Sequence, residues 1–176
     1  MFPCRNKPLN LTKTTGTRQV WNKHFGDLNA EPLGIPGDRI ATLIYRLAVK
    51  NEHPQFADPK VSIIFIGIND VVHKTPDIPG QMDFLLTWIK NNMPATKIVL
   101  QALLNGMSTA IPVNQAYEKL AEKHNILWST CGQDIKKMDR KYMADLLHPN
   151  FNGQTKLLGC LSELVQPLLD SANAGN

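Results

Sequence analysis

Apolar residues in this chain gather in short continuous runs, separated by longer segments in which apolar and polar positions alternate with a helical period. Three of these runs, 61–68, 96–104 and 125–130, are rich in β-branched or bulky residues and follow a polar or proline-containing break. Runs of this length and composition are typical of strands that are buried on both faces of a sheet. The pattern therefore predicts three buried strands.

The segments between these runs show the helical repeat of apolar positions. In one of them, apolar residues recur at i, i+3, i+4 and i+7 from Ile40, which places them on a single helix face. The predicted helices cover 38–50, 78–93, 112–124 and 153–171. Strands that alternate with helices predict an α/β fold with a parallel sheet. In such folds, functional sites lie beyond the carboxyl ends of the strands.

The chain of 176 residues is short enough to form one domain, because a division would leave pieces too small to bury a stable core. We expect an atypical N-terminal segment over 1–11, a single domain over 12–171 and a polar tail over 172–176. No apolar run approaches the roughly 20 residues of a membrane span, and the start of the sequence does not resemble a secretory signal. These features predict a cytoplasmic location.

The net charge of +4 raises the question of nucleic-acid binding. The densest basic cluster, 136–141, is interrupted by Asp139, and no aromatic-rich basic stripe or binding motif accompanies it. We therefore predict a solvated loop at this position and no nucleic-acid partner.

The chain also lacks the signatures of cofactor chemistry. Its histidines do not show the spacing of a zinc site, and no two cysteines are close enough in sequence to form one. Neither G-x-x-x-x-G-K-[ST] nor G-x-G-x-x-G occurs, so a nucleotide cofactor is not indicated. We predict that the protein uses neither a metal nor a cofactor.

Three cysteines, at positions 4, 131 and 160, are an odd number and too few for a disulfide framework. We expect them to be free thiols in a reducing compartment. Cys131 and Cys160 lie in or beside apolar segments, and we expect both to be buried.

A candidate acid–base pair lies near the C-terminus. Asp145 and His148 are three positions apart, and Pro149 favours an extended conformation for His148. A histidine held in a loop, with a carboxylate close enough to bind its Nδ1–H, forms half of a nucleophilic triad. The alternative for such a pair alone is a capping or surface interaction.

Two further motifs contain candidate donors to an anion. Gly34 and Gly37 lie where an apolar segment turns into a helix, so the Gly37 N–H would be a natural anion donor, although a plain turn would also explain both glycines. Asn69, at the end of the run 61–68, can direct its amide at a developing oxyanion. We expect Asp70 to accept backbone N–H bonds and shape the turn, with an Asx turn as the alternative.

In this order, Gly-x-x-Gly-Asp before a helix, Gly-x-Asn-Asp after a strand and Asp-x-x-His-Pro before the last helix resemble the SGNH (GDSL) hydrolase family. The resemblance covers roughly residues 12–169. Within the family, the chain looks most like the catalytic subunits of platelet-activating-factor acetylhydrolases. It implies a flavodoxin-like three-layer α/β/α fold, hydrolysis of acyl or acetyl esters through an acyl-serine, and no cofactor. By resemblance, His148 is the base, Asp145 orients it, and the Gly37 N–H and Asn69 side chain are oxyanion donors. The related subunits dimerise, so a homodimer is one expectation.

The nucleophile of that family is a serine in a Gly-Asp-Ser motif at the end of its first strand, and no Gly-Asp-Ser occurs in this chain. The family's spacing, counted back from Trp21, places the motif on 8–12 and puts Asn10 at the nucleophile position. The residues upstream are polar and interrupted by Pro3, so they do not predict the strand that should carry it. Loss of a triad nucleophile lowers kcat on the order of a million-fold. We therefore expect the chain to be inactive or nearly so.

Two explanations of the missing serine remain open. The sequence is either a truncated or wrongly spliced product of an esterase gene, or a pseudoenzyme that keeps the pocket for ligand binding or dimerisation. Retention of the other four candidate residues, Gly37, Asn69, Asp145 and His148, favours a recent loss of the serine. A nearby threonine would replace the serine only if the backbone were rebuilt; the candidates are Thr12, Thr14 and Thr15.

Overall fold

The computed structural model describes residues 17–52, 59–104, 108–136, 139–145 and 147–173. In chain order, its elements are α1 (Thr17–Phe25), η2 (Gly26–Leu28), α2 (Ile40–Ala48), β1 (Val61–Ile64), α3 (Ile68–Val72), α4 (Ile78–Asn92), β2 (Lys97–Gln101), η3 (Ser108–Ala110), α5 (Ile111–His124), β3 (Leu127–Ser129) and α6 (Phe151–Asn173). The N-terminal segment and the polar tail of the predicted domain division lie wholly or largely outside the described residues.

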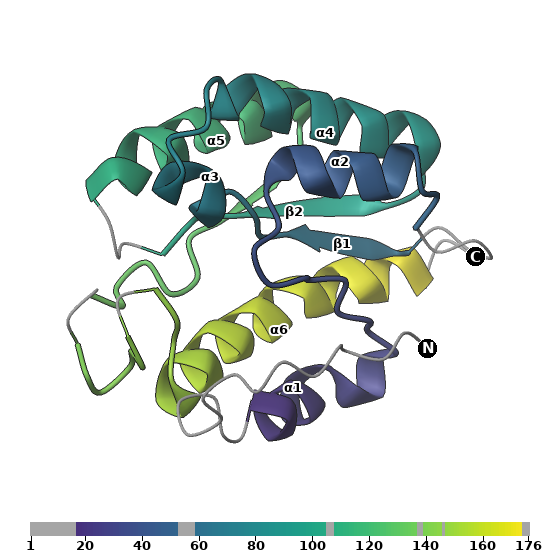
Figure 1. Cartoon of the computed structure of the whole chain (residues 1–176). Helices are drawn as coiled ribbons and strands as arrows, with labels where there is room; N and C mark the ends of the chain where they lie inside the picture. The colour runs from purple at the N-terminus through teal and green to yellow at the C-terminus, as the bar shows by residue number, and fades with distance from the viewer. Residues whose placement is uncertain (1–16, 53–58, 105–107, 137–138, 146, 174–176) are drawn as a thin grey trace.

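The three described strands form one parallel sheet in the order β1-β2-β3. Helices α2, α4 and α5 lie on one side of this sheet, and α1 and α6 lie on the other (Figure 1). The predicted α/β fold with three layers is therefore confirmed. Because all strands run the same way, their carboxyl ends share one edge, and β1 and β2 both deliver loops to it.

Each face of the sheet has its own hydrophobic cluster, which explains why the strands are apolar on both sides. On β2, Ile98 and Leu100 belong to the cluster beneath α4 and α5, whereas Val99 belongs to the cluster beneath α6. Leu100 and Val99 are both fully buried. Alternate residues of a strand point to opposite faces, so a strand covered on both sides must be apolar throughout.

The strands are shorter than the sequence predicts. The run 61–68 was expected to be one strand, but β1 ends at Ile64 and helix α3 begins at Ile68. The break is at Gly67, whose φ of 118° a strand does not allow. Similarly, β2 and β3 cover only the central parts of 96–104 and 125–130. The four predicted helices are present with ends shifted by two residues or fewer, and α1 and α3 were not predicted.

The prediction of free thiols is wrong for two of the cysteines. Cys131, after β3, and Cys160, within α6, form a disulfide with a Cα–Cα distance of 5.7 Å. Cys131 is buried as expected, but Cys160 lies in an exposed position. The two residues are 29 positions apart, so their spacing carried no signal of pairing. Cys4 lies outside the described residues, and the predicted cytoplasmic location loses its argument from cysteine chemistry.

Among the described residues, no helix is both long enough and apolar enough to cross a bilayer.

Candidate active site

Asp145 and His148 meet in a compact loop between β3 and α6. The carboxylate oxygen Oδ1 of Asp145 accepts the backbone N–H groups of Leu147 and His148, both at 2.8 Å. The His148 imidazole Nδ1 lies 3.0 Å from the other oxygen, Oδ2. The predicted pairing of this carboxylate with this ring is therefore present in the structure. Because the carboxylate can only accept, Nδ1 carries the hydrogen and Nε2 is the free acceptor.

The same contacts determine the charge of Asp145. Partial burial acts to raise its pKa, but the two backbone N–H donors and the His148 ring outweigh burial and lower the pKa to about 2. Asp145 is therefore ionised at neutral pH, as a residue that orients and stabilises an imidazolium must be. The His148 side chain is 68% exposed, so its Nε2 is open to a ligand.

The loop is held by short-range hydrogen bonds. Met143 and Pro149 form an antiparallel bridge, and the Ala144 N–H donates to the His148 carbonyl at 2.8 Å. The side-chain oxygen of Asn150 then accepts the N–H groups of residues 152 and 153, which caps the start of α6. Gly153 is required there, because a Cβ at this position would overlap the Tyr142 carbonyl. The dyad thus sits directly before the N-terminus of α6.

Asn69 lies in the first turn of α3, rather than at the end of a strand as predicted. Its Nδ2 donates to the Asp38 carbonyl at 2.8 Å, so the amide faces the segment that contains Gly37. Gly37 is exposed and has a φ of 87°, a conformation that favours glycine. The structure therefore links the two predicted oxyanion donors through the residue that follows Gly37. Asn69 keeps a second amide hydrogen for another acceptor.

Asp70 accepts a backbone N–H, as predicted, but from a distant helix. Its Oδ2 accepts the Ile40 N–H at 3.0 Å, and the carboxyl group is fully buried. Helix α2 has no side-chain cap from its own Arg39, so Asp70 supplies the cap from α3. Asn69 and Asp70 together hold residues 38 and 40, which positions the turn at Gly37.

Tyr117 is a structural member of the site that the sequence analysis missed. The fully buried hydroxyl on α5 donates to the Ile66 carbonyl at 3.3 Å, immediately before the Gly67 turn. A Cβ on Gly67 would overlap this hydroxyl. Burial, and secondarily the nearby Asp70 carboxyl, raises the pKa of Tyr117 far above its ordinary range. The hydroxyl is therefore a permanent donor that supports the turn; nothing local in the sequence distinguishes Tyr117 from other apolar-face residues.

A small apolar cavity of about 180 Å³ lies between the dyad loop and the start of α3. The dyad loop contributes His148 to its wall, and α3 contributes Ile68, the neighbour of Asn69. The remaining lining residues are apolar: Phe65, Leu103, Leu104, Met143, Leu147 and Pro149. Among the described residues that line the cavity, the imidazole is the only titratable group, so these residues present one base to an apolar ligand.

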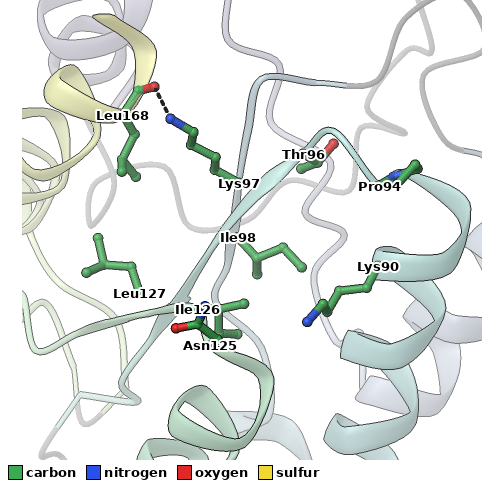
Figure 2. A pocket seen from close by; sticks show the side chains of 9 residues that line it. All are labelled: Lys90, Pro94, Thr96, Lys97, Ile98, Asn125, Ile126, Leu127 and Leu168. Atoms are coloured by element: carbon green, nitrogen blue, oxygen red, sulfur yellow. Dashed lines mark hydrogen bonds between the residues drawn. The ribbon is translucent and has the colours of Figure 1, made fainter. Parts of the chain in front are cut away.

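A second cavity, of about 340 Å³, lies at the opposite edge of the sheet, beside the start of β2 and of β3. Figure 2 shows Lys90 and Lys97 among its lining residues, on different sides of Ile98. Lys90 donates to the His124 carbonyl at 2.8 Å and Lys97 to the Leu168 carbonyl at 3.2 Å, so both ammonium groups bind helix carbonyls. The described residues of its lining include no histidine, cysteine or carboxylate. Candidate acid–base chemistry is therefore found at the smaller cavity.

Two further predictions concern a metal ion and the position of the nucleophile. Within the part of the chain that the structure describes, no group of three or more histidine, cysteine, aspartate and glutamate side chains could hold a metal ion. Asn10, the predicted position of the missing nucleophile, lies outside the described residues, as do the three candidate threonines.

Known proteins share this sequence pattern and fold. The chain is 25% identical over 164 residues to the human platelet-activating factor acetylhydrolase IB subunit alpha2, covering 86% of this chain and 71% of that protein. Its fold is similar to a GDSL-like lipase from Bacteroides thetaiotaomicron, with a TM-score of 0.64, 18% identity and coverage of 91% and 84% of the two chains. It is also similar to Axe2, an acetylxylan esterase from Geobacillus stearothermophilus, with a TM-score of 0.62, 16% identity and coverage of 85% and 78%.

The profile of the GDSL-like lipase/acylhydrolase family matches residues 8–156, which is most of the chain. The match includes the Gly37 turn, the Gly67 turn and the loop that carries Asp145 and His148. The chain therefore belongs to the GDSL-like lipase/acylhydrolase (SGNH) family.

Proposed function

We propose that the smaller cavity, beside His148, is the acyl site of an ester hydrolase. We also propose that the chain lacks the serine needed for turnover. The observation that supports the site is the apolar cavity whose wall includes the His148 imidazole, braced by the ionised Asp145. An imidazole fixed in this way can take a proton from a hydroxyl nucleophile and return it to a leaving alcohol. Family membership implies an ester substrate.

The proposed reaction assigns a role to each residue. A serine hydroxyl would attack the ester carbonyl while His148 Nε2 takes its proton. Asp145 keeps the ring in the correct tautomer and stabilises the imidazolium. The Gly37 N–H and the second amide hydrogen of Asn69 would donate to the tetrahedral oxyanion. Water, deprotonated by His148, would then release the acid from the acyl-serine.

The size and polarity of the cavity restrict the acyl group. An apolar cavity of roughly 150 Å³ accepts benzene, so this cavity of about 180 Å³ suits an uncharged acyl chain of up to about six carbons. We therefore propose short unbranched acyl esters, from acetyl to hexanoyl, as the substrate class.

The position of the first serine favours a second candidate, a non-catalytic module that binds such ligands. No serine precedes Ser62 in the chain. Ser62 is the second residue of β1, near the amino end of that strand, whereas the candidate site lies at its carboxyl end. With Asn10 at the nucleophile position, the amide side chain cannot be deprotonated to attack an ester. Dimerisation, as in the related acetylhydrolase subunits, would be compatible with this module.

Turnover and binding can be measured separately. Hydrolysis of p-nitrophenyl butyrate and labelling by a fluorophosphonate probe should be absent from the unmodified chain. Both should appear in Asn10→Ser, disappear again in the double variant with His148→Ala, and stay absent in the matched control Asn6→Ser. Activity in the unmodified chain would disprove the Asn10 assignment. A folded Asn10→Ser variant that stays inactive but binds butyrate would favour the non-catalytic module.

A further inference from the structure

The disulfide encloses the part of the chain that carries the proposed base. Asp145 and His148 lie between Cys131 and Cys160, so the bond closes a loop around the dyad. One end of the loop leaves the sheet after β3, and the other enters α6 directly after the dyad. The position of His148 over the cavity therefore depends on how this loop is attached at its two ends.

The Cys131 end is attached firmly to the sheet. The fully buried Gln101 donates from Nε2 to the Cys131 carbonyl at 2.8 Å and accepts a hydrogen bond from the Ser129 hydroxyl. These bonds join the residue after β3 to the end of β2 and do not involve the cysteine sulfur. They should hold Cys131 in place whether the disulfide is formed or broken.

The Cys160 end is attached through helix α6. Helix α6 packs through buried Leu157 and Leu161, but Cys160 itself occupies an exposed position on the helix. The first turn of α6 is joined to the dyad loop by the Asn150 cap and by the Asn150 amide, which donates to the carbonyls of Arg140 and Lys141 at 3.1 Å. A shift of α6 would therefore be transmitted to the loop.

We propose that Cys131–Cys160 is a thiol–disulfide exchange site that controls how firmly His148 is held at the cavity. This inference rests on the proposed function, because it concerns the same base. Because Cys160 is the exposed residue of the pair and Cys131 is buried, we assign the Cys160 Sγ as the point of attack, and the partner is a dithiol reductant. The dithiol need not bind at a second site on the chain.

The exchange is a two-electron reduction of the bond. A thiolate of the reductant attacks the Cys160 sulfur, the Sγ–Sγ bond breaks, and the Cys131 thiolate leaves and takes a proton from solvent. The second thiol of the reductant, as a thiolate, then displaces Cys160 from the mixed disulfide, and Cys160 takes a proton. The products are two protein thiols and the oxidised, cyclic reductant.

Hydrogen exchange measured by mass spectrometry tests the conformational consequence. Peptide mapping under non-reducing conditions should first recover Cys131 joined to Cys160. Dithiothreitol should then accelerate amide exchange about tenfold over 147–157 and leave exchange in α4 unchanged. Cys160→Ser should reproduce the reduced pattern without reductant, Cys4→Ser should behave like the unmodified chain, and reoxidation should restore protection.

Butyrate binding, measured by calorimetry, gives the functional readout. Reduction should weaken the affinity for butyrate about fivefold, because His148 and Leu147 line the cavity. If the mapped bond is absent, or if exchange over 147–157 does not change on reduction, the inference is wrong. Equal acceleration in α4 would also overturn it, because the bond would then serve general stability. If neither form binds butyrate, the proposed acyl site fails, while the exchange data still decide the role of the disulfide.

Discussion

The two parts of the candidate site are built in opposite ways. The turn at 67–70 is buried at Gly67 and Asp70 and is tied to other elements, since Asp70 caps α2 and Tyr117 of α5 supports the preceding carbonyl. The described residues of the loop, 139–145 and 147–150, are mostly exposed or half-buried and are held mainly by hydrogen bonds between near neighbours. The side of the site that contains the proposed oxyanion donors therefore depends on the tertiary fold for its shape. The loop that carries Asp145 and His148 is shaped by its own hydrogen bonds, and its position depends on α6.

The largest expected effect is on the buried turn. Gly67→Ala should destabilise the protein by about 3 kcal/mol, because the new Cβ would be strained at positive φ and would overlap the Tyr117 hydroxyl. Gly34→Ala is the matched control, since an added Cβ meets nothing within 4 Å there, and it should change stability by less than about 0.5 kcal/mol. Urea unfolding measures both. Equal stabilities would show that the turn is not constrained as described.

The next effect compares a cap from a distant element with a local cap. Asp70→Ala leaves the buried Ile40 N–H without its acceptor and should lower the free energy of unfolding by about 2 kcal/mol. Asp77→Ala removes the exposed cap that accepts the Gly80 N–H at 3.0 Å within α4, and should cost about 1 kcal/mol. Thermal unfolding of the two variants at one pH ranks them. If Asp77→Ala were more destabilising than Asp70→Ala, this result would contradict the assignment of Asp70 as the buried cap of α2.

A smaller effect is expected in the dyad loop. Asn150→Ala removes both the cap of α6 and the bonds to the carbonyls of residues 140 and 141, and should cost about 1 kcal/mol. Asn150→Asp keeps the oxygen of the cap and loses only the donated bonds, so it separates the two contributions. Urea unfolding gives the stabilities, and the amide signal of His148 reports whether the loop keeps its shape. An Asp variant as unstable as the Ala variant would show that the cap contributes little.

The smallest effect is the pH dependence of Asp145. The folded-state pKa of about 2 lies below the ordinary 3.8, so the unfolded chain binds more protons between these values. The stabilisation that ionised Asp145 gives to the folded state is therefore complete above about pH 4 and is lost as the pH falls through about 2. The carboxyl is 37% exposed, so the contribution should stay below about 1 kcal/mol. The amide signals of Leu147 and His148 should titrate near pH 2, and the Asp145→Asn variant should show no such transition.

Sequence patterns were sufficient for the features that repeat over short distances. The period of apolar residues identified four helices and the centres of three strands, and the Asp-x-x-His spacing identified a dyad whose bonds are local. Element ends were less predictable, because Gly67 stops β1 through a backbone angle that an apolar run does not encode. Helix α3 was missed for a different reason, because its five residues are too few to show a helical period.

The sequence alone determined four of the helices, the centres of the three strands and the pairing of Asp145 with His148, because these features depend on residue type and on neighbours a few positions away. Only the tertiary structure decided that Asp70 caps Ile40, 30 positions distant, and that Tyr117 supports Ile66, 51 positions distant. It also decided that Cys131 and Cys160 pair. Such contacts arise when the parallel sheet and its helices pack together, and that packing brings separate segments to one edge without leaving any periodic trace along the chain.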